Sequence, residues 1–411
     1  MLPPRSVAII GGGPAGAALG THLVRAGCRV AIFRAPQRPK MLIGESLIPA
    51  VVTCLRELGV EEQIKSFSTY KPGATFYFSA VDEIQFDFGF GAADAPSYAY
   101  NTPRDLFDKA ILDNAEREGV TVFPFMAEVE FDPVSQGARL SDASMARAQG
   151  FFESQPDFVV DATGRSRMFS KALNIPFREG KRKDAAMFAH IDNVHVPHAG
   201  HIHLNRLGRG WSWRIPLPGR TSVGMVAPKE WVETFGSNTT DQYDAILRTS
   251  SVMKEFIQGA RITEVTKYSN YQLISEQIYG PNWALVGDAA GFIDPIFSSG
   301  LLLSFTSAKS LSEVLLGAGD LEFYQRRHKR HLRAWQRMVD IFYDGRFLGL
   351  VRIGRHPEYV QQYGPAVEGL GLHLTRILTG VAPFHPDTQR IVTRSVRKWL
   401  PAKSEYRLRI L

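Results

Sequence analysis

Short apolar runs separated by amphipathic stretches open this chain, and their order predicts strands joined by helices. Residues 6–10 read as a buried strand, and residues 17–26 follow as a helix that ends at Gly27. Residues 29–33 form the next apolar run and return as a second strand. Strand, helix and returning strand make a βαβ unit, so we predict a parallel sheet at the start of the chain.

The pattern changes twice further along the chain. Residues 184–275 alternate in short β-like runs with loop signals between them, whereas the pattern is helical from Leu301 onward. We therefore predict an α/β fold with a Rossmann-like domain, an inserted, mainly β substrate domain and a helical C-terminal region. The predicted Rossmann-like domain comprises residues 1–80, 101–183 and 276–310, the substrate sheet residues 81–100 and 184–275, and the helical region residues 311–411.

A glycine-rich turn joins the first strand to its helix. Residues 11–16 read Gly-Gly-Gly-Pro-Ala-Gly, which contains Gly-x-Gly-x-x-Gly. Such glycines permit a tight turn, a close approach of a pyrophosphate and a close helix–strand contact, and the first N–H groups of the helix attract the anion. We expect Gly13 and Gly16 to leave the space that the pyrophosphate needs. The predicted dinucleotide site comprises Gly11, Gly13, Pro14, Ala15 and Gly16.

The end of the second strand departs from the usual dinucleotide pattern. An acidic side chain is expected on the ribose about 20 residues after the glycines, but Arg34 stands there. An arginine at this place could read a 2′-phosphate, lie along the adenosine or serve only the end of the strand. We favour contact with the adenosine and include Arg34 in the site.

A second glycine-containing motif follows the apolar run at residues 283–286. Residues 287–300 read Gly-Asp-Ala-Ala-Gly-Phe-Ile-Asp-Pro-Ile-Phe-Ser-Ser-Gly. The Asp288 carboxylate at a tight turn suits a ribityl hydroxyl, and the serines and Gly300 open a helix whose N–H groups face an electron-rich ligand. This motif resembles the second flavin-binding motif of the flavin-dependent halogenases and their monooxygenase relatives.

The resemblance implies an FAD-binding domain of the flavoprotein monooxygenase type, with FAD as the cofactor. Residues 161–164, Asp-Ala-Thr-Gly, are similar to the segment that closes the dinucleotide fold in these proteins. Matching the family's motifs residue by residue extends the predicted FAD site. The added residues are Glu45, Ser46, Arg104, Asp288, Pro295, Ser298, Ser299, Gly300 and Leu301.

Two further features resemble the halogenases more specifically. Trp211 and Trp213 stand in Trp-Ser-Trp-Arg-Ile-Pro, and alternate residues of a strand face one way, so their rings would form an aromatic wall. Core packing also explains a bare Trp-x-Trp, but in this family the wall separates the flavin from the substrate. Lys71 occupies the place of the family's catalytic lysine, although an isolated lysine is usually a surface residue. The predicted catalytic residues are Lys71, Trp211 and Trp213.

The resemblance also implies a reaction. In this family reduced FAD and O₂ form a C4a-hydroperoxide, a halide then yields hypohalous acid, and the lysine ammonium aims the acid at the substrate. The chain has one Gly-x-Gly-x-x-Gly, and FAD takes it. We therefore expect reducing equivalents from a separate flavin reductase or from free reduced flavin.

The same resemblance implies that the substrate is an electron-rich aromatic group, such as an indole, a phenol or a pyrrole. Phe297 stands where free-tryptophan halogenases keep a glutamate, which argues against free tryptophan. The chain is similar to phenol- and pyrrole-type halogenases, whose substrates are often tethered to carrier proteins. It is also similar to monooxygenases that hydroxylate an aromatic side chain of a precursor protein in quinone-cofactor maturation. A saturating flavin reductase, or a flavin-binding module without O₂ chemistry, is the alternative that Lys71 and the tryptophans disfavour.

Composition bears on location and partners. The chain of 411 residues has two cysteines, no apolar run of about 18 residues and a start that leads directly into the first strand, so we expect a cytoplasmic protein without a membrane span or signal peptide. The net charge of the chain is +7, and two stretches are strongly basic. Residues 381–411 have seven Lys/Arg and two Asp/Glu, and residues 321–340 have six Lys/Arg and two Asp/Glu. These stretches are either solvated helix faces or a docking surface for an acidic protein.

Two other kinds of ligand are disfavoured. No nucleic-acid recognition fold accompanies the basic stretches, so no nucleic-acid partner is predicted. The histidines between residues 190 and 203 lack a third ligand at a familiar spacing, so no metal site is predicted.

Overall fold

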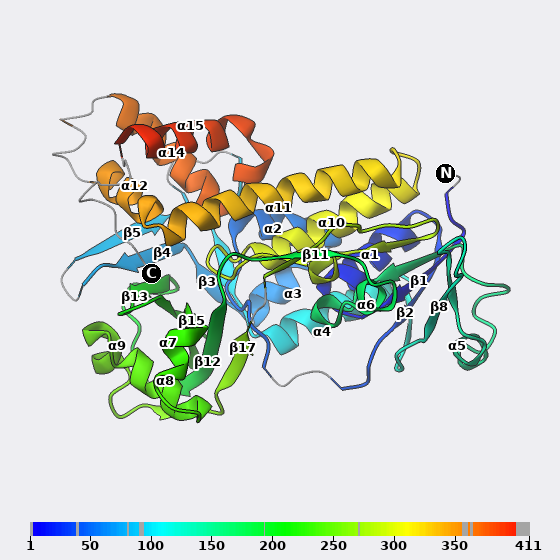
Figure 1. Ribbon diagram of the computed structural model, residues 1–411, viewed down its shortest axis with the longest axis horizontal. Helices are drawn as coiled ribbons and strands as arrows, with labels where there is room; N and C mark the ends of the chain where they lie inside the picture. The colour runs from blue at the N-terminus through cyan, green and yellow to red at the C-terminus, as the bar shows by residue number, and fades with distance from the viewer. Residues whose placement is uncertain are drawn as a thin grey trace.

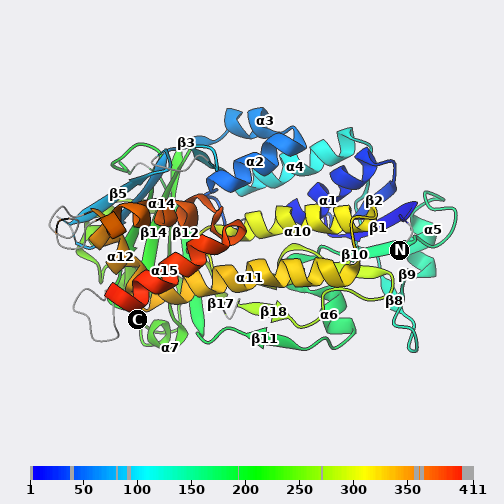
Figure 2. The same cartoon turned by 90° about the horizontal axis from the view of Figure 1, so that it is seen from above.

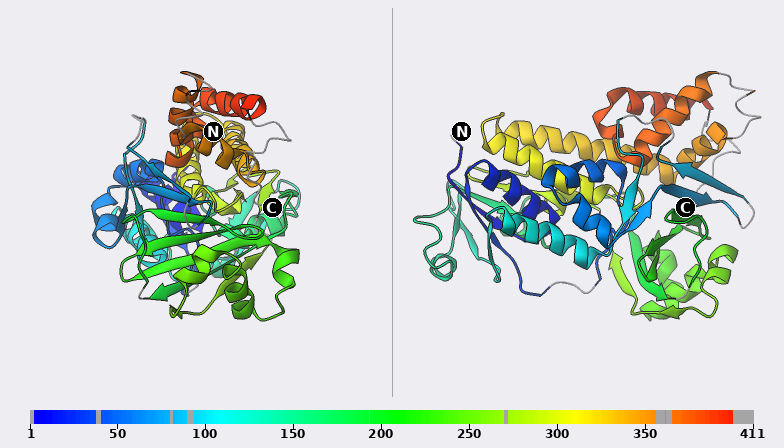
Figure 3. Two further views of the ribbon diagram at one scale, coloured as in Figure 1. Left: turned by 90° about the vertical axis from the view of Figure 1, so that its left-hand side faces the viewer. Right: turned by 180° about the vertical axis from the view of Figure 1, so that it is seen from behind.

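The computed structural model describes residues 3–37, 41–79, 82–89, 94–192, 194–269, 272–355, 361 and 365–399. The molecule is elongated (Figure 1). A parallel sheet lies toward the end that carries the N-terminus, and a large antiparallel sheet and the C-terminal helices lie at the other end (Figure 3). The predicted α/β fold with a helical C-terminal region is confirmed.

Five parallel strands form the first sheet, in the order β19-β10-β1-β2-β7. Their bounds are Trp283–Leu285 (β19), Phe158–Asp161 (β10), Ser6–Ile10 (β1), Arg29–Phe33 (β2) and Thr121–Phe123 (β7). The central strands are apolar along most of their length because helices cover the sheet. Helix α1 (Pro14–Arg25) contacts both α4 (Arg104–Arg117) and α10 (Ser299–Leu315). The βαβ unit expected from the apolar pattern is present.

The second sheet is mostly antiparallel and runs β16-β12-β15-β14-β13-β4-β5, with β17 paired to β12. The bounds are Arg261–Ile262 (β16), Asp184–Asp192 (β12), Arg220–Pro228 (β15), Trp211–Leu217 (β14), Ile202–Arg206 (β13), Gly73–Tyr77 (β4), Glu83–Asp87 (β5) and Thr266–Ser269 (β17). Strand β4 pairs in parallel with β13 and precedes the predicted boundary at residue 80. The sheet therefore takes in more of the N-terminal chain than expected, and the other domain boundaries stay predictions.

The two faces of this sheet pack against different partners. Helices α7 (Lys229–Glu233), α8 (Thr239–Leu247) and α9 (Ser251–Phe256) cover one face around a core that includes Met225. The other face carries Trp211 and Trp213 into the larger core, which continues to the parallel sheet. Strand alternation explains this division, because neighbouring residues point to opposite faces.

Long helices complete the fold. Helix α11 (Leu321–Tyr343) lies alongside α10 and runs from the parallel sheet toward the large sheet (Figure 2). It begins after Asp320, whose carboxylate accepts a hydrogen bond from Phe323 N at 2.6 Å. The helices that follow are α12 (Arg346–Arg355), α14 (Pro365–Thr379) and α15 (Pro386–Trp399). Among the described residues, no helix combines the length and apolar character needed to cross a membrane.

Smaller elements connect these layers. The helices are α2 (Pro49–Leu58), α3 (Glu61–Ser66), α5 (Asp142–Arg147) and α6 (Met168–Ala172), and the 3₁₀ turns are Gly164–Ser166, Gly287–Ala289 and Ala382–Phe384. The strands are β3 (Thr69–Lys71), β6 (Ala99–Asn101), β8 (Val129–Phe131), β9 (Ala138–Leu140), β11 (Phe177–Glu179), β18 (Leu273–Ser275) and β20 (Gly291–Phe292). Pairing of β3 with β6 places Lys71 beside the chain that leads into α4.

Candidate active site

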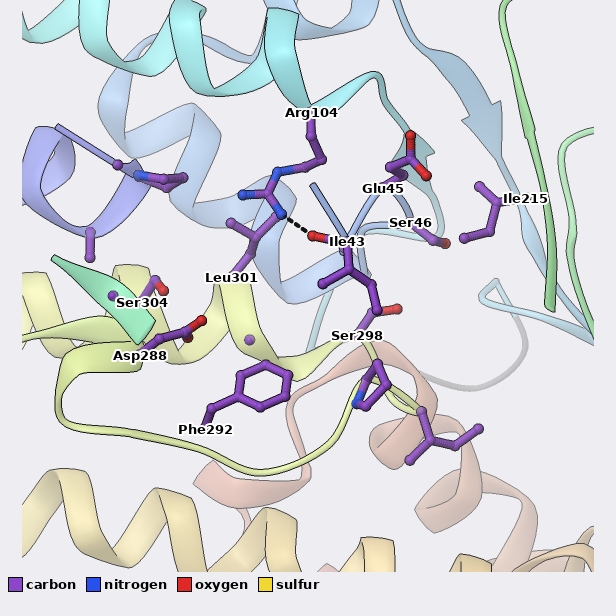
Figure 4. A pocket seen from close by; sticks show the side chains of 18 of the residues that line it. Ile43, Glu45, Ser46, Arg104, Ile215, Asp288, Phe292, Ser298, Leu301 and Ser304 are labelled. Carbon is purple, nitrogen blue, oxygen red and sulfur yellow. Dashed lines mark hydrogen bonds between the residues drawn. The ribbon is translucent and has the colours of Figure 1, made fainter. Parts of the chain in front are cut away.

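A cavity with about 1060 Å³ of empty space lies between the parallel sheet and the large sheet. It reaches from the N-terminus of α1 to the tryptophans of β14. Many of the residues predicted for FAD line it: Gly13, Pro14, Ala15, Glu45, Ser46, Arg104, Asp288, Pro295, Ser298, Gly300 and Leu301. Figure 4 shows that side chains from separate parts of the chain converge on this one space. Gly16 and Ser299 do not line it.

A second cavity, with about 1700 Å³ of empty space, adjoins the first and shares Gly13, Ala162 and Asp288 with it. Gly11 and Arg34 line this second cavity. Its cationic residues are Arg34, Arg165, Arg167 and Lys171. Cations at a helix N-terminus suit the pyrophosphate of a dinucleotide. The contact of Arg34 with an adenosine stays a prediction.

The three glycines of the first motif have different surroundings. A Cβ on Gly11 would lie 2.3 Å from Ala162 O, and Gly11 has a φ of +115°. A Cβ on Gly16 would lie 2.2 Å from Gly11 O, so Gly16 allows the close packing of α1 on the turn. We had expected Gly16 to leave space for the pyrophosphate, and its surroundings do not support that role. A Cβ on Gly13 meets no atom within 4 Å. The open space for a pyrophosphate therefore lies at Gly13.

Asp288, Glu45 and Arg104 are the charged side chains among the residues that line the first cavity. The Asp288 side chain touches the cavity space but lies deep in the protein, and this burial raises its pKa to about 6, while Arg104 and Arg165 act in the opposite direction. Arg104 is fixed by Asp108, 3.0 Å from its Nε, and donates to Ile43 O at 2.5 Å (Figure 4). A carboxyl group and a fixed guanidinium in one cavity suit a ligand that has both donors and acceptors.

Glu45 and Ser46 are held by side chains from distant parts of the sequence. Glu45 Oε1 lies 2.7 Å from Nε2 of His190 on β12. Ser46 Oγ donates to Asn101 Oδ1 at 2.8 Å. A histidine that we had weighed for metal binding is thus a partner of Glu45. Within the described part of the chain, no three His, Cys, Asp or Glu side chains gather closely enough to hold a metal ion.

Trp211 and Trp213 lie side by side at one end of the cavity. Their ring centroids are 5.6 Å apart, and both rings line the cavity. Arg214, the residue after Trp213, faces the other side of β14, where its guanidinium lies 4.8 Å from the centroid of the Tyr77 ring. The side-by-side geometry expected from strand alternation is present, and the separation of flavin from substrate stays a prediction.

Lys71 lies next to the segment that carries Glu45 and Ser46, because its side chain contacts the following residue, Leu47. Its side chain is 2% exposed, so the surface-lysine interpretation is wrong. Nζ donates to Leu47 O at 2.6 Å and lies 5.2 Å from the centroid of the Phe88 ring. Burial lowers the pKa of Lys71 to about 7. Lys71 lines neither cavity, and its catalytic role stays a prediction.

Sequence reasoning missed most of the apolar lining. The missed residues include Ile43, Ile202, Ile215, Phe292 and Ile296. Three of them stand inside motifs that we had recognised, Ile215 after the tryptophans and Phe292 and Ile296 in the second flavin motif. Their motif positions were the available signal. Ile202 had none, because its place beside the cavity depends on the pairing of β13 with β4 and β14.

These features together define a class of protein. Open space at Gly13, a cationic cavity at the N-terminus of α1, and a second cavity wall built from the Asp288 motif fit the two halves of FAD. A Rossmann-like domain joined to a β-rich domain that carries aromatic side chains into the cofactor cavity is the arrangement of an FAD-dependent oxidoreductase.

Comparison with known proteins identifies the family. The family profile described as tryptophan halogenase matches residues 6–96 and 91–346. This chain therefore belongs to the tryptophan halogenase family of flavin-dependent enzymes, and its cofactor is FAD.

Individual relatives match most of this chain. A tryptophan 2-halogenase from Chondromyces crocatus is 31% identical, and the match covers 82% of this chain and 67% of that protein. A 1H-pyrrole-2-carbonyl-(peptidyl-carrier protein) chlorinase from Pseudomonas fluorescens is 25% identical, with 82% of this chain and 83% of that protein covered. The solved structure of the flavin-dependent brominase Bmp2 shares the fold, with a TM-score of 0.78 at 22% identity, and the match covers 96% of this chain and 98% of the brominase.

Proposed function

We propose that this protein halogenates an electron-rich aromatic group, a pyrrole, phenol or indole, with reduced FAD, O₂ and a halide. The observation that carries the proposal is the pair of tryptophans at one end of the first cavity, in a chain of the halogenase family. The names of the pyrrole chlorinase and the tryptophan halogenase among its relatives support halogenation.

The chain's own residues hold the cofactor and shape the reaction space. FAD, when bound, supplies the redox chemistry with O₂. Arg104 and Asp288 offer it a fixed donor and a carboxyl group. Trp211 and Trp213 make the far end of the cavity apolar, which excludes water and protects an oxidant from hydrolysis. Lys71 would then donate a hydrogen bond from its ammonium to the oxidant on its way to the substrate.

Mass spectrometry after turnover with and without bromide tests the proposal. Candidate substrates are a small pyrrole, a small phenol and the same groups attached to an acidic carrier protein. We expect a product with the isotope doublet of bromine when bromide is present, and no oxygenated product when it is absent. An oxygenated product that forms equally well without halide would establish hydroxylation in place of halogenation.

A protein-borne substrate fits the surroundings of Phe297. Phe297 stands where free-tryptophan enzymes keep a glutamate, and its side chain is 5% exposed. It packs among Trp335, Phe342 and Phe347, with ring centroids 5.2 to 6.0 Å apart. This position therefore offers an apolar ring to its surroundings and no carboxylate for the amino group of a free amino acid. We propose a substrate carried by an acidic protein.

The basic surface of the helical region supports such a partner. A groove of about 800 Å³ on α11 is lined by Gln325, Arg326, Lys329, Arg330, Arg333, Ala334, Arg337 and, from α15, Gln389. Five of these residues are cationic, and among the described residues no carboxylate lines the groove. Arg394 and Arg397 are exposed on α15. The predicted basic segment also included Lys403, Glu405, Arg407 and Arg409, which lie outside the described residues.

Reversing Arg394 and Arg397 to Glu should slow the capture of a protein-borne substrate and spare the oxidation of a small aromatic surrogate. Surface charges are screened beyond about 8 Å at physiological ionic strength, so capture by the native enzyme should weaken steeply with salt, mainly through the association rate. Stopped-flow binding of an acidic carrier at several salt concentrations measures both effects.

Lys65→Glu with Lys254→Glu is the matched control for this prediction. It changes the net charge equally on α3 and α9, away from α11 and α15. An equal loss for both substrates, or for both pairs of variants, would mean that the charge serves only solubility.

NADPH alone should not reduce the bound FAD at an enzymatic rate. The chain carries one dinucleotide turn, at Gly11 to Gly16, and FAD takes it. Anaerobic stopped-flow mixing of the FAD-loaded protein with NADPH measures the rate. We expect reduction far below about 1 s⁻¹, the low end of typical turnover, until a separate flavin reductase is added. Stoichiometric reduction at that rate or faster by NADPH alone would contradict the prediction and would favour the reading of a 2′-phosphate by Arg34.

A further inference from the structure

A buried chain of hydrogen bonds leads from the tryptophans into the loop of the second flavin motif, and it passes through the last residue of α11. Trp211 Nε1 donates to the Tyr343 hydroxyl at 2.9 Å, and that hydroxyl donates to Asp294 Oδ2 at 3.1 Å. The direction is fixed, because an indole N–H only donates and the tyrosine has one proton to give. Trp211, Tyr343 and Asp294 are 3%, 4% and 1% exposed.

Asp294 connects this series of hydrogen bonds to the first cavity. Its Oδ1 accepts a hydrogen bond from Ile296 N at 3.0 Å. Asp294 thereby shapes the loop whose next residues, Pro295, Ile296 and Ser298, line the cavity. The ring of Trp211 and the loop at the flavin are therefore held by the same carboxylate.

An arginine fixes the tyrosine and the carboxylate together. Arg182 Nη2 lies 3.0 Å from Asp294 Oδ2, its Nε lies 2.9 Å from Asp184 Oδ2, and its Cζ lies 3.5 Å from the centroid of the Tyr343 ring. Burial opposes the charge of Arg182, but the carboxylates of Asp294 and Asp184 beside it raise its pKa, so it stays charged.

Burying charged side chains in a core costs free energy, because they lose their contacts with water. Well-packed apolar residues of similar volume are often as stable as a buried ionic group, or more stable. What the ionic group adds is a restricted orientation for each member, because a hydrogen bond limits the distance and the angle between its donor and its acceptor.

We propose that Tyr343 is a positioning residue that fixes the ring of Trp211 relative to the flavin-binding loop, with Asp294 and Arg182 as its anchors. Tyr343 does not line the cavity, so it acts through Trp211. The helical C-terminal region, which supplies Tyr343, thereby sets the angle of the tryptophan ring that faces the cavity. The consequence for product formation rests on the proposed halogenase function, whereas the orientation of Trp211 does not.

Tyr343→Phe tests the proposal, and Tyr324→Phe is its matched control. Tyr324 lies on the same helix, is 0% exposed and donates its hydroxyl proton to Leu285 O at 2.6 Å. Both variants remove one buried hydroxyl together with the hydrogen bonds that it makes, so both should lower the melting temperature. Only Tyr343→Phe should change the environment of Trp211.

The first readout needs no substrate. The fluorescence that Trp211 contributes is obtained by subtracting the spectrum of Trp211→Phe from that of the same protein with Trp211 present. We expect its emission maximum to shift in Tyr343→Phe and to stay unchanged in Tyr324→Phe, with FAD occupancy retained in both. An unchanged Trp211 contribution in Tyr343→Phe would overturn the proposal whatever reaction the enzyme performs.

The second readout is the ratio of brominated product to hydrogen peroxide, with a small pyrrole and bromide as probes. Displacing a reacting group by about 1 Å costs up to 10²-fold, so we expect Tyr343→Phe to lower the ratio by about tenfold or more. In the Trp211→Phe background Tyr343→Phe should add no further loss, because the two residues act as one unit. An undiminished loss in that background, or an equal loss in Tyr324→Phe, would mean that Tyr343 only stabilises the fold.

A second variant covers the case in which Tyr343→Phe does not fold. Arg182→Lys keeps a cation beside Asp294 but loses the planar fork that contacts Asp184 and Asp294 together and the stacking on Tyr343. It should shift the Trp211 emission in the same direction and lower the product ratio less. Native values for both readouts in Arg182→Lys would also overturn the proposal.

Discussion

Gly13→Val should abolish the flavin absorbance of the purified protein and leave the chain folded. A Cβ at Gly13 meets no protein atom within 4 Å, and the backbone there has a φ of −79°, which valine adopts without strain. The added side chain therefore enters only the space that the pyrophosphate needs, at the N-terminus of α1. The native protein should bind one FAD per chain, measured by the ratio of flavin to protein absorbance, with circular dichroism as the test of folding.

Gly16→Val makes the contrasting control. Its Cβ would lie 2.2 Å from Gly11 O, so this variant should lose its fold together with FAD. A Gly13→Val protein that keeps full FAD occupancy would show that the site assignment is wrong.

Lys71→Ala should keep FAD and reactivity with O₂, release hydrogen peroxide and lose product by roughly 10²-fold or more, the effect of removing one preorganised electrostatic group. The side chain is 2% exposed, and its nitrogen donates to Leu47 O. Within the described residues, no carboxylate forms an ion pair with it. A buried lysine without a carboxylate is costly for the fold, and such groups are often functional. Product and peroxide are measured together against FAD oxidised, and a normal product yield from Lys71→Ala would contradict the catalytic role.

The pH dependence separates the charge of Lys71 from its bulk. Burial lowers its pKa from 10.5 to about 7, so the ammonium is present below pH 7. If the ammonium is the working form, product per FAD should fall as the pH rises through 7.

The free energy of unfolding should change with pH in the opposite direction to product formation. The unfolded chain binds the proton of Lys71 more tightly, so the free-energy cost of burying Lys71 is largest below pH 7 and falls between pH 7 and 10.5. Lys71→Met fills the same space, and it should be more stable than the native protein below pH 7 while losing the pH-dependent product.

Local patterns were enough to predict the parts of the site that neighbouring residues build. The βαβ unit followed from apolar runs around the glycine-rich turn, because the turn requires glycine at Gly11, where φ is +115°. The side-by-side rings of Trp211 and Trp213 followed from the period of a strand. The family's motifs predicted that Asp288 lies at the cavity. This was possible because the tight turn that carries Asp288 is built from a few neighbouring residues.

The same reasoning misjudged features that depend on distant packing. Gly16 meets Gly11 O across the turn and not a pyrophosphate. Strand β4 joins the large sheet through β13, more than a hundred residues later in the chain. Lys71 was predicted to be catalytic from its place in the family's motif, and its burial, which depends on the layers around β3, excludes only the alternative of a surface lysine.

The sequence by itself determined the class of cofactor, the βαβ unit that we propose binds it and the strand that carries the two tryptophans, because each depends on backbone geometry over a few neighbouring residues. The tertiary structure decided how these pieces are held. Glu45 with His190, Trp211 with Tyr343, and Arg182 with Asp294 join residues 145, 132 and 112 positions apart. No periodicity marks such partners, because a hydrogen bond between distant side chains depends on which faces of two sheets and a helix meet, and that is set by the packing of the whole chain.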